Sequence, residues 1–383
     1  MTVTSALGFV ASGVACGLKS SGARDVSVVR NLGPLDVAAG VFTSNRFQAA
    51  PVLWSRQVVA DGHLRAVVLN SGGANACTGP AGFQDTHITA ETAAEALGIG
   101  AGEVAVCSTG LIGVRLPMER LLGGVLTACA AASRDGGSEA AEGIMTTDTV
   151  PKTVAITRDG FTIGGMAKGA GMLAPSLATM LVVLTTDAIV TAELAARSLR
   201  RATAETFDRI DSDGCMSTND TVLLLASGAS GVTPNPDDFT AALTRACASL
   251  AQQLSADAEG ASKDIVITVR GAHTDGDALE VARAIARSNL LKCAIHGEDP
   301  NWGRVLAAAG TASARFDADE VDVAMNGVWV CRGGAVGADR DLVDLSARRV
   351  VIEVDLHAGS STAEVLTNDL TALYVHENSA YAT

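Results

Sequence analysis

The sequence has 383 residues, with 28 basic and 42 acidic side chains and a formal net charge of -14. This acidic balance argues against a general nucleic-acid or anionic-membrane binder, which would need a basic surface. Aromatic residues make up only 3% of the chain, so stacking platforms for nucleotide bases are not expected. The length suits two domains, each with enough residues to bury a core.

The eight cysteines and six histidines are scattered along the chain. No two cysteines form a Cys-x-x-Cys pair and no nearby histidine completes a zinc pattern, so we expect free thiols in a reducing compartment. Residues 1–18 lack the basic start of a signal peptide, and no apolar run reaches the length of a membrane span. The sequence therefore predicts a soluble, cytoplasmic protein without a bound metal.

The N-terminal part of the chain alternates short apolar strands with helices. Gly98 suits the position after a helix end, and Pro117 suits a helix start. The order of strand, turn and helix is typical of an α/β or α+β layered domain. In chain order, the patterns predict irregular structure or short strands at 8–21, strands at 26–29, 37–43 and 65–70, a helix at 89–97, a strand at 103–107, a helix from 117 toward 132 and a strand at 162–166.

Residues 168–184 change character within one stretch. Glycines and Pro175 predict a loop in the first part, whereas residues 180–184 form a short apolar run that suits a buried strand. Thr179 stands where the loop becomes the strand. Taken alone, it is an ordinary strand-opening threonine, because threonine favours strands.

Beyond this stretch the predicted helices have clear start signals. Thr191 is a candidate N-cap, and Asn235 followed by Pro236 is a second one. Phe239, Leu243 and Leu250 fall on one apolar face of the second of these helices. In chain order, the patterns predict a helix from 191 to about 207, a strand at 221–226, a helix at 236–254, a strand at 265–269, a helix at 277–288 and a strand at 350–356.

Most common catalytic motifs are absent from the sequence. Gly169-Ala170-Gly171 faintly resembles a dinucleotide-binding loop, but Pro175 and a strand follow where a helix should begin. A Ser/His/Asp triad stays open, because triad members need not be close in sequence. One further chemistry is available: a cut before Thr179 would give a threonine whose hydroxyl is the nucleophile and whose own α-amine is the base.

Residues 168–181, KGAGMLAPSLATML, closely resemble the self-cleavage motif of the ornithine acetyltransferases, also called glutamate N-acetyltransferases. The resemblance covers essentially the whole chain. It implies an α/β (α+β layered) fold with sheets sandwiched by helices. It also implies cleavage between Ala178 and Thr179 into an α chain, 1–178, and a β chain, 179–383, which assemble as an α2β2 heterotetramer. Further blocks match in family order at 40–47, 108–110, 144–148, 296–304 and 378–383.

The same resemblance implies an activity and a set of site residues. Thr179 would take the acetyl group of N-acetylornithine as an ester and pass it to glutamate, without a metal or organic cofactor; use of acetyl-CoA as a co-substrate stays open. Thr109 and Gly110 match the oxyanion hole. An amino-acid substrate brings a carboxylate and ammonium groups, so one fixed cation and one fixed anion make chemical sense. The positions that match substrate contacts are Thr146, Lys168, Thr179, Glu259, Asn378 and Thr383.

Two positions depart from the family pattern. Gly73 stands where a second asparagine is expected, and Gln48 where a lysine is frequent; neither is a predicted site residue. Two other functions stay open: a hydrolase with an N-terminal nucleophile, as in similar aminopeptidases, and an amino-acid-binding protein without catalysis. The presence of Thr109, Lys168 and Thr179 argues against the second of these.

Overall fold

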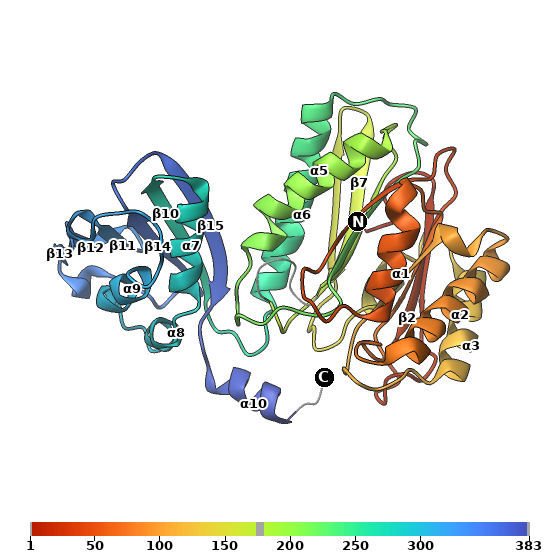
Figure 1. Cartoon of the computed structure of the whole chain (residues 1–383), viewed down its shortest axis with the longest axis horizontal. Helices are drawn as coiled ribbons and strands as arrows, with labels where there is room; N and C mark the ends of the chain where they lie inside the picture. Colours follow the sequence, from red (N-terminus) through yellow and green to blue (C-terminus); the bar gives the residue numbers. More distant parts are fainter. Residues whose placement is uncertain (1, 174–179, 381–383) are drawn as a thin grey trace.

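The computed structural model describes residues 2–173 and 180–380. Within these residues the strands form three sheets of four, five and six strands. The first two sheets and their helices form a layered body, from β1 to α6, and the third sheet forms a separate C-terminal lobe, from β10 to β15. Figure 1 shows the lobe at the left, coloured teal to blue, with the body at the right.

The four-stranded sheet has the order β1-β2-β4-β5, and only its β4–β5 pair is parallel. The helices α2 (Gly79–Leu97) and α3 (Met118–Ala131) cover its outer face, and α4 (Gly137–Gly143) packs against β1 and β2. The strands are β1 (Phe9–Val14), β2 (Val26–Asn31), β4 (Ala66–Asn70) and β5 (Val104–Ser108).

The five-stranded sheet has the order β3-β9-β8-β7-β6. Alternate residues of its central strand β8 enter different cores: Leu181 and Val183 face the four-stranded sheet, whereas Val182 and Leu184 pack with α5 (Ala192–Glu205) and α6 (Pro236–Ala256). The body therefore has four layers, helices–sheet–sheet–helices, which confirms the predicted layered α/β fold. The strands are β3 (Val37–Phe42), β6 (Lys152–Arg158), β7 (Phe161–Lys168), β8 (Leu181–Thr186) and β9 (Thr221–Ala226).

The C-terminal lobe has its own hydrophobic core. Its sheet has the order β13-β12-β11-β14-β10-β15, and α7 packs on β10 and β15. The strands are β10 (Asp264–Ala272), β11 (Asp322–Met325), β12 (Val328–Arg332), β13 (Ala335–Val336), β14 (Arg349–Asp355) and β15 (Ser361–Asn368). The helices are α7 (Asp275–Ala286), α8 (Asn289–His296) and α9 (Trp302–Ala309), and α10 (Ala372–Ala380) follows the lobe.

The predicted cleavage point lies between two neighbouring strands of one sheet. β7 ends at Lys168 and β8 begins at Leu181, and these two residues pair in an antiparallel register. The segments 1–178 and 179–383 therefore share the five-stranded sheet, because β3, β6 and β7 precede the junction while β8 and β9 follow it. A cut there would leave two chains joined by the hydrogen bonds between strands.

The local start and stop signals act as predicted. The Thr191 hydroxyl accepts a hydrogen bond from Leu194 N at 3.2 Å, and Asn235 Oδ1 accepts one from Asp237 N at 2.9 Å. Gly98 ends α2 with φ +67°, a left-handed conformation in which glycine carries no steric penalty. Single 3₁₀ turns lie at Val59–Asp61, Ala101–Glu103, Phe207–Arg209, Ala318–Glu320 and Arg340–Leu342.

Several helices differ from the prediction, and α4, α8, α9 and α10 were not predicted at all. α2 begins ten residues earlier than expected, at Gly79. Gly82 lies inside the helix without breaking it, at a position where an added Cβ would lie 1.9 Å from Thr78 Oγ1. The helix α1 (Ala50–Val58) was not predicted. It covers the edge strand β5, where Trp54 Nε1 and Ser55 Oγ donate to backbone carbonyls at 3.0 and 2.7 Å.

Candidate active site

A cavity of about 370 Å³ opens at one end of the two stacked sheets. Its walls come from the loops that follow β1, β4, β5 and β7 and from the segment that precedes β9. Strand register places these loops together: Val26 pairs with Asn70 and Asn70 with Ser108 in one sheet, and Lys168 pairs with Leu181 in the other. Residues from α6 onward close the remaining side.

The structure gathers the described residues of the predicted site in this one cavity, although they come from distant parts of the chain. Ala178, Thr179 and Thr383 lie outside the described residues. The predicted residues that line the cavity are Thr109, Gly110, Thr146, Lys168, Glu259 and Asn378.

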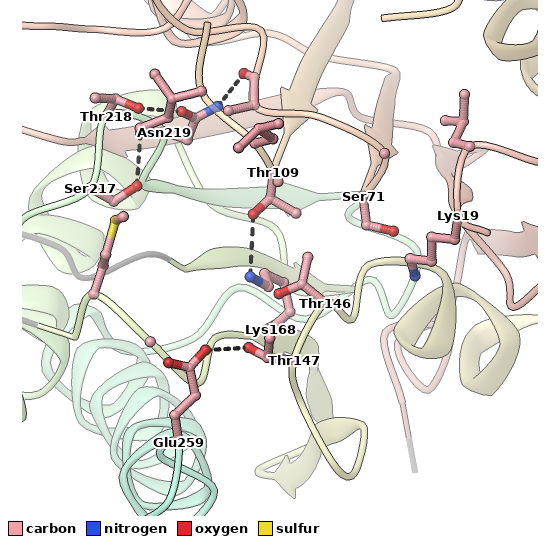
Figure 2. A pocket seen from close by; sticks show the side chains of 18 of the residues that line it. Lys19, Ser71, Thr109, Thr146, Thr147, Lys168, Ser217, Thr218, Asn219 and Glu259 are labelled. Carbon is pink, nitrogen blue, oxygen red and sulfur yellow. Dashed lines mark hydrogen bonds between the residues drawn. The ribbon is translucent and has the colours of Figure 1, made fainter. Parts of the chain in front are cut away.

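Lys168 and Thr109 meet at the centre of the cavity (Figure 2). Lys168 Nζ donates a hydrogen bond to Thr109 Oγ1 at 3.2 Å, and both residues are only 2% exposed. An ammonium group has no lone pair and can only donate. The Thr109 hydroxyl therefore accepts from the lysine and keeps its own hydrogen for another acceptor. This arrangement suits a hydroxyl that donates to developing negative charge.

Gly110 must be glycine in this fold. Its φ is +130°, and an added Cβ would lie 2.9 Å from both Cα and N of Gly73. The missing side chain leaves the Gly110 backbone open to close approach. Gly73, one of the two departures from the family pattern, therefore packs directly against a predicted oxyanion residue. Gly73 N also donates to the carbonyl of Thr109 at 3.0 Å.

Asp148 connects two of the predicted substrate residues. Its Oδ2 accepts from Thr146 N at 2.9 Å, and its Oδ1 accepts from Gly169 N, next to Lys168, at 2.7 Å and from Lys152 Nζ at 2.5 Å. Burial raises the pKa of Asp148, but the charges of the two lysines and the hydrogen bonds outweigh it, so the pKa lies below its usual value. Asp148 is therefore an anion that holds both segments.

Burial lowers the pKa of Lys168 below that of an ordinary lysine. The negative charges of Asp148, Glu259 and Asp220 oppose this shift, whereas the neighbouring Lys152 adds to it. Lys152 itself is fully buried and ion-paired with Asp148 and Asp257. The carboxylates around the cavity therefore favour the charged form of Lys168.

Glu259 forms the acidic side of the cavity. Its Oε1 accepts from Thr147 Oγ1 at 2.6 Å and its Oε2 from Asn378 Nδ2 of α10 at 3.0 Å. Glu259 N donates to the carbonyl of Ala170 at 2.9 Å, which ties the residue to the loop after β7. Figure 2 shows the Glu259 carboxylate beside Thr147, below Lys168. A carboxylate held in this way suits a cationic group of a ligand.

A buried carboxylate fixes the first described residue after the junction. Asp220 Oδ1 accepts from Met180 N at 2.9 Å, and its Oδ2 has no hydrogen-bond partner among the described residues. Burial raises the pKa of Asp220 well above its usual value, although the Met180 N–H and the charge of Lys168 act in the opposite direction. Because Leu181 pairs with Lys168, β8 starts at the end of the sheet where the cavity lies.

The family model described as the ArgJ family matches residues 10–383. The chain belongs to the ArgJ family. A relative from Streptomyces coelicolor, named arginine biosynthesis bifunctional protein ArgJ, is 65% identical over 382 residues and covers 100% of both chains. One from Thermobifida fusca with the same name is 63% identical over 383 residues, again covering 100% of both chains. This ArgJ-family chain is thus an acyltransferase of arginine biosynthesis.

Among solved structures, the ornithine acetyltransferase of Mycobacterium tuberculosis, complexed with ornithine, is 62% identical. The match covers 46% of this chain and 95% of that chain, with a TM-score of 0.45. An ArgJ protein from Bacillus halodurans is 37% identical over 51% of this chain and 97% of that chain, with a TM-score of 0.49.

Sequence reasoning missed several residues of this ArgJ-family cavity. Lys19 and Ser71 line it, and so do Ser217, Thr218 and Asn219. Asn219 Nδ2 joins the two sheets by donating to the carbonyls of Ala74 and Ser108 at 2.6 and 2.8 Å. One signal was available for Lys19, because the chain has only five lysines and this one stands among small residues. The others depend on which loops meet in space, which no local pattern encodes.

Across residues 2–173 and 180–380, no three His, Cys, Asp or Glu side chains are grouped as ligands for a metal ion would be. None of the helices in that part of the chain combines the length and apolar character of a membrane span.

Proposed function

We propose that this ArgJ-family enzyme transfers the acetyl group of N-acetylornithine to glutamate through an ester on Thr179. The main support is the cavity, which brings together six predicted residues from distant parts of the chain, two of them joined by the Lys168–Thr109 hydrogen bond. The register of β7 and β8 supports it as well, because β8 begins two residues after Thr179 at the cavity end of the sheet.

In the first half-reaction, Thr179 Oγ attacks the acetyl carbonyl carbon of N-acetylornithine, and the α-amine of Thr179 accepts the hydroxyl proton. The Thr109 hydroxyl and the Gly110 N–H donate to the oxyanion that develops. The bond between the acetyl carbon and the α-nitrogen then breaks. The proton moves to the leaving nitrogen, so ornithine departs and acetyl-Thr179 remains.

In the second half-reaction, the neutral α-amine of glutamate attacks the ester carbonyl. The bond between the acetyl carbon and Thr179 Oγ breaks, and the threonine oxygen takes back a proton. N-acetylglutamate leaves and the free hydroxyl is restored. Both half-reactions form a tetrahedral intermediate on the acetyl carbon. The same hydrogen bonds from Thr109 and Gly110 can therefore stabilise the oxyanion in each.

We further propose that Thr179 becomes N-terminal by self-cleavage after Ala178, and that two α and two β chains assemble into a heterotetramer. Thr146, Lys168, Glu259, Asn378 and Thr383 contact the substrates. The transfer as written needs no metal or organic cofactor, since the threonine supplies both nucleophile and base. The relatives carry the word bifunctional in their name, which is a reason to test acetyl-CoA as a second donor.

Two measurements on purified protein test this proposal. Denaturing gel electrophoresis should separate the wild type into two chains split before Thr179. Release of ornithine from N-acetylornithine beyond one equivalent per active site should depend on glutamate. Thr179→Ala should stay uncut and inactive, whereas Thr179→Ser, which keeps a hydroxyl, should retain both cleavage and some transfer.

A single full-length chain with full activity would contradict the N-terminal threonine. Release of free acetate without N-acetylglutamate would instead favour the hydrolase. A third assay with acetyl-CoA and glutamate alone decides whether the second donor is used.

A further inference from the structure

The cavity contains a second cation that the proposed reaction does not use. Lys19 lines it from the loop between β1 and β2, together with the hydroxyl residues Ser20, Ser21 and Ser71. In Figure 2, Lys19 and Ser71 lie on the opposite side of Lys168 from Glu259. The cavity therefore offers an anion at one side, a cation at its centre and another cation at the far side.

The loop that carries Lys19 is held in place by Asp25, which is fully buried. The Asp25 carboxylate accepts hydrogen bonds from the backbone N–H groups of Cys16, Leu18 and Lys19 at 2.8, 2.7 and 3.2 Å. The carbonyl of Asp25 accepts one from Ser71 N at 3.0 Å. One buried residue thus fixes both Lys19 and Ser71, as a pre-formed binding site requires.

The ammonium group of Lys19 keeps donors for a ligand. Its Nζ donates to the carbonyl of Arg24 at 2.6 Å, and this is its only hydrogen bond within the described residues. Burial lowers the pKa of Lys19, and the positive charge of Lys168 adds to this effect, while Asp25 and Asp148 oppose it. The two lysines therefore repel each other across the cavity. An anionic group bound beside Lys19 would relieve that repulsion.

The two substrates of the proposed function differ in the charge at the end of the side chain. N-acetylornithine ends in an ammonium group, which suits Glu259, whereas glutamate ends in a second carboxylate, which Glu259 would repel. Resting on that proposed function, we infer that Lys19, with Ser71 beside it, binds the side-chain carboxylate of the acceptor. Donor and acceptor thus share the acetyl position and direct their side chains to opposite sides of the cavity.

Replacing Lys19 by methionine tests this inference. Single-turnover release of ornithine from N-acetylornithine should keep its rate, because the donor does not use Lys19. The kcat/KM for glutamate should fall by roughly ten- to a hundredfold, since a charge-assisted hydrogen bond is lost. Glutamine, the neutral isostere of glutamate, should be affected little as an acceptor. The preference for glutamate over glutamine should therefore fall, whereas Lys19→Arg should retain it.

The glutamate-to-glutamine ratio is measured on one preparation, so partial misfolding does not change it. Arg120→Gln is the matched control: Arg120 Nη1 binds the carbonyl of Gly17 on the same loop at 2.9 Å but does not line the cavity. Its ratio should equal that of the wild type. An unchanged ratio in Lys19→Met, or a loss confined to the N-acetylornithine step, would overturn the inference. Failure of the wild type to make N-acetylglutamate would overturn the proposed function itself.

Discussion

Lysines in the body and in the C-terminal lobe are buried in different ways. The chain has five lysines, and none of them is fully exposed. In the lobe, Lys263 Nζ donates to the carbonyls of residues 345, 346 and 347 at 2.6, 3.0 and 3.2 Å and to Glu298 Oε1 at 2.9 Å. In the body, the only partner of Lys168 Nζ among the described residues is the Thr109 hydroxyl, at 3.2 Å.

The difference separates a structural cation from one that awaits a ligand. An ammonium group has three N–H donors, and leaving buried donors unpaired costs free energy. Lys263 satisfies all its donors within the lobe and can bind nothing else. Lys168 is just as buried but keeps donors directed to an open cavity. Nearby carboxylates offset part of the cost of burying its charge, and a bound substrate can supply the missing acceptors. Burial alone therefore does not distinguish the two roles, whereas the number of internal partners does.

The largest effect is expected from Lys168→Met. Removing this cation takes away a substrate contact and the group that orients the Thr109 hydroxyl, so kcat/KM should fall by roughly 10²- to 10³-fold. The free energy of unfolding should change little, because the lost hydrogen bond is balanced by no longer burying an undercompensated charge. Steady-state kinetics and urea denaturation of the same samples measure both. A large loss of stability with normal kinetics would contradict the assignment.

Lys263→Met should show the opposite behaviour. The substitution leaves three backbone carbonyls without a donor, so the free energy of unfolding should fall by about 3 kcal/mol. The kcat/KM should be unchanged, because Lys263 is not among the residues that line the cavity. Urea denaturation and steady-state kinetics again supply the two numbers. Equal losses of activity and stability in both lysine variants would remove the distinction between the two regions.

The sequence predicted much of the body because its signals are local. Thr191, Asn235 and Gly98 mark helix ends through bonds or dihedral angles within a few residues. The lobe was predicted less well: β11, β12 and β13 are short and separated by tight turns. β15 was missed although Ala363 and Val365 alternate with more exposed residues. That strand could have been found from its period of two.

The residues of the site also fall into a predicted group and a group that was missed. Thr109, Lys168 and Glu259 were predicted from a family resemblance, and the fold brings them to one cavity. Lys19 and Ser71 were not predicted, because their meeting depends on the register of β2 and β4 and on the bonds of Asp25. Such contacts join residues far apart in the chain, and no local pattern records them. Thr179 itself remains a prediction from sequence.

Lys292, a third buried lysine, should make the free energy of unfolding depend on pH. Its Nζ donates to the Thr367 hydroxyl at 2.8 Å and to the carbonyl of Ser212 at 2.5 Å, and burial lowers its pKa to about 8. Between this value and the ordinary lysine pKa of about 10.4, the unfolded chain holds the proton and the folded chain releases it. The free energy of unfolding therefore rises with pH in this window.

Urea denaturation of wild type and Lys292→Met at pH 8 and pH 10 measures that rise. Other titrating groups cancel, because both proteins carry them. The stability advantage of the wild type should grow by about 2 kcal/mol over this interval. A constant or shrinking advantage would show that Lys292 keeps its proton in the folded protein, as a fully compensated lysine would.

The smallest effect is expected from Glu298→Gln, and it decides which partner of Lys263 matters. Glu298 is the charged partner of this lysine, but its side chain is 51% exposed. Solvent screens such a pair, and glutamine keeps an oxygen that can accept the same bond, so the loss should stay below about 1 kcal/mol. Urea denaturation of Glu298→Gln and Lys263→Met under the same conditions compares their losses in the free energy of unfolding. If the two losses were equal, the ion pair with Glu298, and not the three backbone carbonyls, would account for the stability that Lys263 contributes to the lobe.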